Sequence, residues 1–234
     1  MIFEKLCIEA FDERSISKDI HEMNDHIKSL LINAPPSHEI PFEVLQDIRR
    51  KGGGLLESQP YSEKAENRLI NQDNKKVTIR IFNNDTPNFV YLHIHGGGHC
   101  IGAADMQDQS LEKISNDLNC VVVSVEYRLA PANPYPAAPD DCEAAAIWLI
   151  ENSKSQFNTE KIVIGGESAG ANLSAVTLQR LKSKGLLGNV KGANLIYGSY
   201  DARLTPSALR QQGSDEIFLL SYEMIRKFRD SYFQ

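Results

Sequence analysis

The sequence predicts an α/β fold in which a mostly parallel β-sheet is joined by crossover helices. Short apolar runs rich in β-forming residues recur at residues 89–95, 120–126, 161–165 and 193–197, and the stretches between them have helical patterns. Buried parallel strands are near-continuous apolar runs of this kind, and crossover helices separate them along the chain. With 234 residues, the chain is long enough for one such domain with a small cap.

The remaining core elements follow from the same periodicities. Helices are expected between and after the parallel strands, over residues 110–118, 139–152 and 168–184. Upstream, Val77, Ile79 and Ile81 alternate with polar residues, which is typical of a half-buried antiparallel strand. We interpret the polar residues 57–71 as a segment that leads into this strand.

Both ends of the chain are predicted to be helical. Apolar residues with helical spacing lie within residues 17–34, before a pair of prolines: Ile20, Met23, Ile27, Leu30 and Leu31. A second helix is predicted over residues 41–50, with Pro41 at its first position and three glycines after its end. These two helices form a predicted N-terminal lobe. Residues 213–234 are predicted to form one or two further helices, with no strand after them.

Composition limits the kinds of partner that the chain can have. There are 25 basic and 31 acidic residues, a formal net charge of -6, which disfavours nucleic acid and leaves a small neutral substrate as the simpler expectation. No apolar stretch approaches the roughly 20 residues that cross a bilayer, and the N-terminus lacks a signal-peptide pattern. Four scattered cysteines indicate reduced, mostly buried thiols: Cys7, Cys100, Cys120 and Cys142. We therefore expect a cytoplasmic protein without membrane contact.

A nucleophile motif lies where a predicted strand meets a predicted helix. The stretch Gly166-Glu167-Ser168-Ala169-Gly170 matches G-x-S-x-G, a tight strand-to-helix turn that leaves the serine strained and exposed. Glycines on either side of the serine remove Cβ atoms that would clash in such a turn. The backbone N–H of Ala169 begins the helix, where unpaired donors and the helix dipole favour a negative oxygen. A chance match in a loop is the alternative, which the flanking strand and helix disfavour.

A glycine-rich loop follows the first parallel strand at His95-Gly96-Gly97-Gly98. Backbone N–H groups in such a loop can stabilise the oxyanion of a tetrahedral intermediate, and we expect Gly97, Gly98 and Ala169 to supply these donors. His95 and Gly96 are expected to support the loop. Phosphate binding is a weaker alternative, because the loop fits neither G-x-G-x-x-G nor the Walker pattern.

The histidines near this loop raise the question of a metal site. His93, His95 and His99 are close in sequence, but along a strand only His93 and His95 share a face, and no carboxylate lies at ligand spacing. We expect no metal and no cofactor.

Taken together, the motifs resemble those of the hormone-sensitive lipase family of α/β-hydrolases. Four segments carry the resemblance: His95-Gly96-Gly97-Gly98, Tyr127-Arg128-Leu129-Ala130-Pro131, Pro134-Tyr135-Pro136-Ala137-Ala138 and Gly166-Glu167-Ser168-Ala169-Gly170. The resemblance implies an α/β-hydrolase core over residues 55–200, an N-terminal helical cap over residues 1–54 and the start of a second cap segment over residues 201–234. It also implies an esterase of short-chain acyl esters, with Ser168 as nucleophile.

The chain departs from that family's pattern at several positions. His99, Ala132, Glu167 and Ala171 replace residues that are more usual there, and His99 is expected to change the polarity of the pocket wall. In this fold the acid and the histidine of the triad follow the serine, yet all six histidines precede Ser168. The fold is therefore expected to lack its last strands and helices, and turnover is expected to be impaired.

Three interpretations of this incomplete triad remain. The first is an impaired carboxylic ester hydrolase acting on small-molecule esters, in which His99 or His95 could serve as a substitute base. The second is a non-catalytic relative that retains the ester pocket for ligand binding. The third is self-association or complementation by another polypeptide through the open edge of the sheet.

Overall fold

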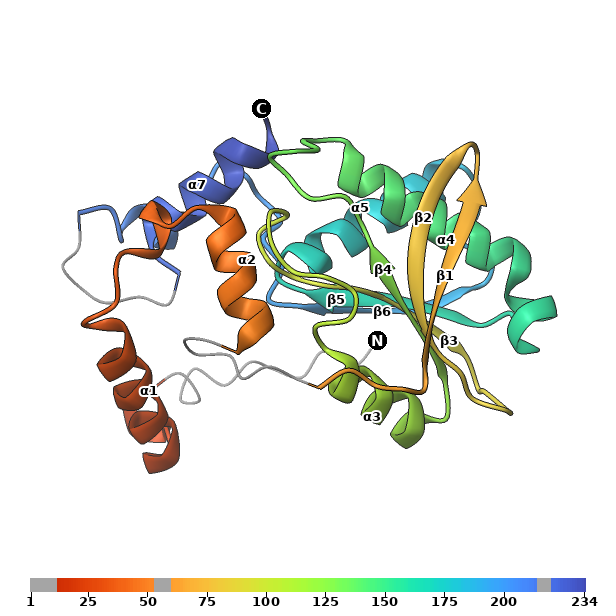
Figure 1. Cartoon of the computed structure of the whole chain (residues 1–234), viewed down its shortest axis with the longest axis horizontal. Helices are drawn as coiled ribbons and strands as arrows, with labels where there is room; N and C mark the ends of the chain where they lie inside the picture. Colours follow the sequence, from red (N-terminus) through yellow and green to blue (C-terminus); the bar gives the residue numbers. More distant parts are fainter. Residues whose placement is uncertain (1–11, 53–59, 214–219) are drawn as a thin grey trace.

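A six-stranded sheet with helices on both faces forms the body of the protein (Figure 1). The computed structural model describes residues 12–52, 60–213 and 220–234. The strand order is β1-β2-β4-β3-β5-β6. The strands are β1 Ala65–Gln72, β2 Lys75–Phe82, β3 Val90–Ile94, β4 Val121–Glu126, β5 Ile162–Glu167 and β6 Val190–Ile196. The predicted fold class is confirmed, because the pairs β4–β3, β3–β5 and β5–β6 are parallel, whereas β1–β2 and β2–β4 are antiparallel.

The two faces of the sheet pack against different helices. Alternate side chains of β3 point to opposite faces, so that Leu92 packs in the larger core and Tyr91 in the smaller one. Helices α4 Ala137–Phe157 and α5 Ala169–Ser183 cover the larger core, whereas α3 Asp108–Leu118 covers the smaller one. All five residues of β3 are buried, as the continuous apolar run at residues 89–95 predicts. The three crossover helices are confirmed, and α4 extends beyond the predicted residues 139–152 at both ends.

The first strand was not predicted from the sequence. Residues 65–71, interpreted as part of a polar lead-in, form β1 together with Gln72, and this strand pairs antiparallel with all of β2. The two strands are joined at Asp73 and Asn74, both of which have positive φ, as tight hairpin turns require. Backbone pairing stabilises an exposed edge strand with few apolar side chains, so its sequence carries little periodic signal.

The opposite edge of the sheet is formed by β6. This strand pairs with β5 alone among the described residues, and six of its seven residues are exposed. Leu195 and Ile196 are 40% and 41% exposed. Among the described residues, the outer edge of β6 is therefore without a pairing strand, and the expectation of self-association depends on this feature.

Helices from both ends of the chain lie on one side of the body (Figure 1). They are α1 Lys18–Leu31, α2 Phe42–Lys51, α6 Pro206–Leu209 and α7 Tyr222–Tyr232, with short 3-10 turns η2 Glu13–Ser15 and η3 Ser37–Glu39. The predicted helices over residues 17–34 and 41–50 are confirmed, although Pro41 caps α2 and Phe42 is its first residue. Of residues 213–234, part forms α7, and residues 214–219 lie outside the described ranges. Helix α6 was not predicted.

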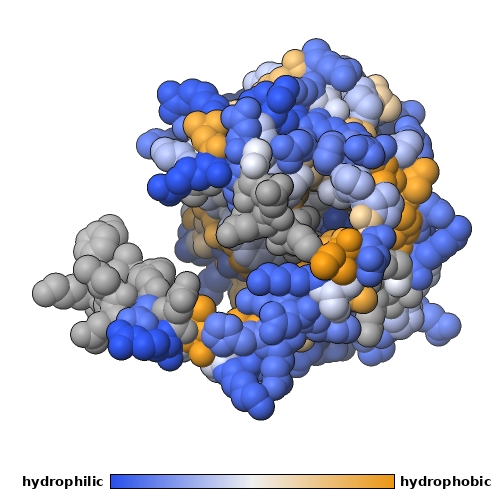
Figure 2. Space-filling view, turned by 90° about the vertical axis from the view of Figure 1, so that its left-hand side faces the viewer, coloured by the Kyte–Doolittle hydropathy of each residue, from blue (hydrophilic) through white to orange (hydrophobic). Residues whose placement is uncertain are grey.

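The side that carries these helices is mostly hydrophilic, with apolar residues in small separate patches (Figure 2). Helix α1 has no buried residue. Within the described ranges, no helix has the length and apolar character to span a bilayer. Cys100, Cys120 and Cys142 are buried free thiols, as expected, and Cys7 lies outside the described residues.

Candidate active site

Ser168 occupies a strained turn between β5 and α5. Its backbone has φ 55° and ψ -119°, a conformation that costs an ordinary residue on the order of 1–3 kcal/mol and is found at functional sites. The Ser168 N–H donates to the carbonyl of Ile196 at the end of β6, at 2.9 Å. Ala169 is the first residue of α5, where helix N–H groups lack intrahelical partners. The predicted strand-to-helix turn over residues 166–170, called the elbow below, is thus present, with the serine held at a helix N-terminus.

The two glycines of the motif are required by close packing on β3. A Cβ placed on Gly166 would lie 1.9 Å from the carbonyl oxygen of Ile94, and one placed on Gly170 would lie 1.8 Å from the same atom. Ordinary contacts to a Cβ are 3.4–4 Å. The turn can therefore approach β3 only because both positions lack a side chain.

The glycine loop lies directly beside the elbow. A Cβ on Gly96 would be 3.2 Å from the Cβ of Ser168, so the two predicted motifs are neighbours in space. Gly97 and Gly98 have φ of 125° and 59°, which favour glycine. Within the described part of the chain, the N–H groups of Gly97 and Gly98 donate to no protein oxygen. They are free to bind an anionic oxygen.

His95 packs beneath this loop and is held by its neighbours. Its ring stacks on Tyr127 with centroids 4.2 Å apart, and its Nδ1 lies 2.9 Å from the Gly96 carbonyl. Burial lowers the pKa of His95 to about 3, so the ring is neutral at physiological pH. Its Nε2 is buried and has no hydrogen-bond partner among the described residues.

Glu167 connects the elbow to the glycine loop. Its Oε1 accepts hydrogen bonds from the Gly96 N–H at 2.6 Å and from Gln107 Nε2 at 2.9 Å. Its Oε2 lies 3.1 Å from His93 Nε2, and the other ring nitrogen of His93 lies 3.1 Å from Ser124 Oγ. Burial would raise the pKa of Glu167, but these hydrogen bonds outweigh it and lower that pKa to about 2.

The side chain of His99, which follows the loop, contacts residues of both α7 and α5. Its ring stacks on Tyr232 of α7 at a centroid distance of 3.9 Å, and its Nε2 lies 3.3 Å from Oδ1 of Asn172, one turn along α5 from Ser168. Burial lowers the pKa of His99 to about 4. The expectation that His99 alters the polarity of a pocket wall stays a prediction.

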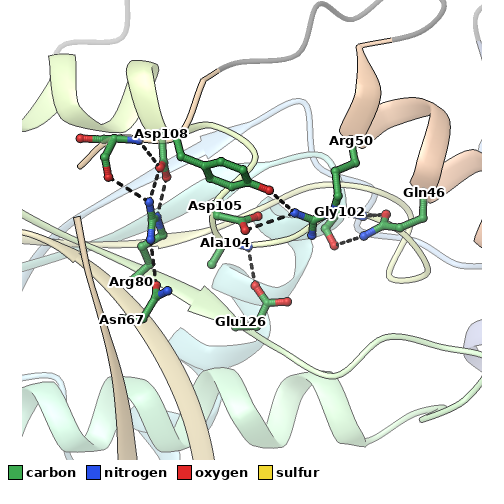
Figure 3. Close-up of polar contacts among 11 residues, drawn as sticks. Gln46, Arg50, Asn67, Arg80, Gly102, Ala104, Asp105, Asp108 and Glu126 are labelled. Carbon is green, nitrogen blue, oxygen red and sulfur yellow. Dashed lines mark hydrogen bonds and ion pairs between the residues drawn. The ribbon is translucent and has the colours of Figure 1, made fainter. Parts of the chain in front are cut away.

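The segment after the glycine loop is anchored by polar contacts (Figure 3). The Gln46 side chain of α2 both donates to and accepts from the backbone of Gly102, at 2.9 and 2.6 Å. Arg50, one turn further along α2, binds Asp105 at 3.3 Å. Deeper in the core, Arg80 of β2 pairs with the fully buried Asp108. The contacts of Gln46 and Arg50 fix α2 to the segment that leads from the glycine loop to α3.

Helix α7 closes over the same loop from the other end of the chain. A Cβ on Gly98 would lie 2.3 Å from the ring of Phe228, which shows that this ring lies directly on the glycine. Phe228 stacks on Phe42 of α2 at 5.6 Å. The ammonium group of Lys227 lies 4.5 Å from the centroid of the Phe42 ring and donates to the carbonyl of Ile40.

The structure thus brings together the residues that the sequence singled out, and it adds others. Gln107 and Phe228 were missed, because neither belongs to a recognisable motif. His93 had been considered only as a metal ligand, yet it contacts Glu167 and Ser124. The described residues contain no group of three or more His, Cys, Asp or Glu that could hold a metal ion. No described side chain is hydrogen-bonded to the hydroxyl of Ser168.

Several known proteins with similar sequences are named as esterases or lipases. An arylesterase of Saccharolobus solfataricus is 36% identical over 138 residues, which are 56% of this chain and 45% of that protein. Lipase 2 of Moraxella sp. (strain TA144) is 36% identical over 122 residues, 48% of this chain and 28% of that protein. The chain thus spans less than half the length of these relatives.

Solved structures give the same fold. The hyperthermophilic esterase of the archaeon Pyrobaculum calidifontis superposes with a TM-score of 0.78 at 24% identity, over 93% of this chain and 70% of that one. An esterase of Pseudomonas putida superposes with a TM-score of 0.77 at 19% identity, over 91% and 67%. A family model described as alpha/beta hydrolase fold matches residues 91–234, more than half of the chain. The chain belongs to this alpha/beta hydrolase family.

Proposed function

We propose that the protein is a serine-dependent carboxylic ester hydrolase that acts on short-chain acyl esters through an acyl-enzyme. The observation that carries this proposal is the strained backbone of Ser168, with φ 55°, at a helix N-terminus beside a loop with free N–H groups. Strain of this kind costs stability and persists at functional sites. Relatives named arylesterase and lipase support the same reaction class.

Each residue of the site has a role in this reaction. The Oγ of Ser168 forms a bond with the ester carbonyl carbon, and the N–H groups of Gly97, Gly98 and Ala169 stabilise the resulting oxyanion. The carbon–oxygen bond to the alcohol then breaks, and the alcohol leaves with the proton that the Ser168 hydroxyl loses when its Oγ bonds to the carbonyl carbon. Water hydrolyses the acyl-serine. Loss of one oxyanion donor typically lowers the rate by roughly 100- to 1000-fold.

We further propose that this chain turns over slowly by itself. Serine needs a general base to become a good nucleophile, and the described residues place none on Ser168. His95 and His99 are poor substitutes, because burial lowers their pKa values to about 3 and about 4. Serine proteases that lack triad members retain only about 10³- to 10⁴-fold acceleration over water.

The segments of the chain have proposed roles as well. We assign residues 55–200 to the hydrolase core, residues 1–54 to an N-terminal cap and residues 201–234 to the start of a second cap segment. The stacking of Phe42 on Phe228 and the position of Phe228 directly on Gly98 support this division. A cytoplasmic location and association through the edge strand β6 remain predictions.

The proposal is tested by hydrolysis of p-nitrophenyl acetate, compared between the parent chain and Ser168→Ala over a series of imidazole concentrations. Imidazole hydrolyses the ester directly, so the quantity of interest is the difference between the two proteins. We expect this difference to be small without imidazole and to grow with it, because a soluble base can deprotonate Ser168. Equal rates at every concentration would contradict a serine-dependent reaction.

The same experiment tests the claim of slow turnover. A rate typical of esterases in the absence of imidazole, abolished by Ser168→Ala, would show that the chain needs no further base. Tight binding of an ester analogue without acylation of Ser168 by a fluorophosphonate would instead favour the alternative, a non-catalytic ligand-binding relative.

A further inference from the structure

The Gly96 N–H is held by a charged group, whereas the N–H groups of the next two residues are not. The Glu167 carboxylate accepts from Gly96 at 2.6 Å, a short distance that is typical of hydrogen bonds to ionised acceptors. Glu167 is also the residue before Ser168 in the chain, so one side chain joins the backbone of the nucleophile to the backbone of the glycine loop.

The carboxylate itself is fixed from two further directions. Gln107, at the N-cap position of α3, donates to the same oxygen at 2.9 Å, and the His93 ring contacts the other oxygen at 3.1 Å. His93 is in turn positioned by Ser124 of β4. The Glu167 side chain is only 16% exposed, and three contacts from β3, the glycine loop and the start of α3 define its orientation.

Close packing makes this connection rigid. A Cβ on Gly96 would lie 2.8 Å from the Glu167 carbonyl and 3.2 Å from the Ser168 Cβ, so the loop lies directly on the elbow. The Gly96 N–H belongs to the peptide group that directly precedes those of Gly97 and Gly98. Fixing the orientation of this peptide group therefore fixes the start of the backbone that carries the N–H groups of these two residues.

We propose that Glu167 is a positioning residue: by binding the Gly96 N–H it fixes Gly97 and Gly98 relative to Ser168. Its catalytic consequence rests on the proposed function, since a correctly placed oxyanion hole matters only if Ser168 forms a tetrahedral intermediate. The effect of Glu167 on the conformation of the glycine loop does not depend on catalysis and can be measured without turnover.

The test uses the full chain labelled with ¹⁵N-glycine, because the protein has 15 glycines and their amides can be followed individually by NMR. Hydrogen exchange of Gly96 is measured in the parent, Glu167→Ala and Glu167→Gln. Gly165, in the middle of β5, reports in the same spectrum whether the sheet remains folded. Gln107→Ala is the matched control, because it removes a neutral donor to Glu167 and leaves the Gly96 contact in place.

Hydrogen bonds to charged groups contribute roughly 1.5–3 kcal/mol, so Glu167→Ala is expected to accelerate Gly96 exchange by about 10- to 100-fold while Gly165 stays protected. Glu167→Gln keeps an acceptor without the charge and is expected to accelerate it by about fivefold. It should also shift the Gly96 amide proton upfield and move the Gly97 and Gly98 signals. Gln107→Ala should change Gly96 exchange by less than about threefold, on the same scale.

Unchanged Gly96 exchange in a folded Glu167→Ala protein would overturn the proposal, as would an equal acceleration in Gln107→Ala. If Glu167→Ala also loses Gly165 protection, Glu167→Gln decides: unchanged Gly96 exchange and unmoved Gly97 and Gly98 signals would overturn the proposal. Repeating the measurement in Ser168→Ala separates the two claims. The hydrogen exchange of Gly96 in Ser168→Ala should match that of the parent, even if the hydrolysis assay excludes a serine-dependent reaction.

Discussion

Because the elbow packs closely on β3, we predict that Gly170→Ala destabilises the protein, the opposite of what the same substitution does in an ordinary helix. Gly170 lies in the first turn of α5, where replacing glycine with alanine normally stabilises a helix by up to about 1 kcal/mol. Here the new Cβ would lie 1.8 Å from the Ile94 carbonyl oxygen and 2.7 Å from that of His95. Both contacts are to backbone, so no side-chain rotation can relieve them.

Relief requires the elbow and β3 to separate until the closest contact grows from 1.8 Å to about 3.4 Å. Overpacking of a tight core costs roughly 1–3 kcal/mol and sometimes more, and we place Gly170→Ala at about 3 kcal/mol because the clash is between two backbones. Subtracting the gain in helix propensity leaves a net loss of about 2 kcal/mol. For a chain of this size that corresponds to a fall in Tm of about 4–8 °C.

Chemical and thermal denaturation followed by circular dichroism measures this change. Gly188→Ala is the matched control, because a Cβ at Gly188 would meet no atom within 4 Å, and its effect should stay within about 0.5 kcal/mol. A Gly170→Ala protein as stable as the parent, or more stable, would refute the packing argument and leave helix propensity as the dominant effect.

Three further predictions concern charge and packing around the site. The pKa of Glu167 is about 2, below the ordinary 4.5. The ionised carboxylate therefore contributes about 3 kcal/mol to the free energy of unfolding, a contribution that is complete above pH 4.5 and is lost as the pH falls through about 2. In urea denaturation at a series of pH values, the stability difference between the parent and Glu167→Gln should shrink over that interval. Asp108→Ala removes the carboxylate that pairs with the buried Arg80 guanidinium and should cost about 3–5 kcal/mol in the same assay. Gly98→Ala combines a φ of 59° with a Cβ 2.3 Å from the Phe228 ring, so it should destabilise the chain. Its cost should be smaller when it is introduced into a Phe228→Ala background, by the part that is due to the clash.

Strongly periodic parts of the fold could be predicted from the sequence. The four parallel strands and the helices between them were found because burial on both faces imposes continuous apolar runs. Strand β1 was not found, since an exposed edge strand is stabilised by backbone pairing with β2 and its side chains are mostly polar. The turn residues Asp73 and Asn74 were the available signal for this hairpin.

In the candidate site too, residues that belong to a local sequence motif could be predicted, whereas residues placed by contacts far apart in the chain could not. Ser168 and the glycine loop could be located because strained turns and free backbone donors restrict the residue types that fit. The roles of Gln107 and Phe228 depend on contacts with residues 60 and 130 positions away along the chain, and no local pattern encodes them. Glu167 lies between these cases: it belongs to the motif, but its hold on Gly96 is visible only in three dimensions.

The central claim is that Ser168 is the residue that accepts an acyl or phosphonyl group. Its most direct test is intact-protein and peptide mass spectrometry after incubation with a fluorophosphonate, with and without imidazole, in the parent and Ser168→Ala. We predict a single adduct on the peptide that contains Ser168, formed slowly by the chain alone, faster with imidazole and absent from the variant. A folded parent chain that gives no adduct on Ser168 under either condition, or labels equally in Ser168→Ala, would contradict the claim.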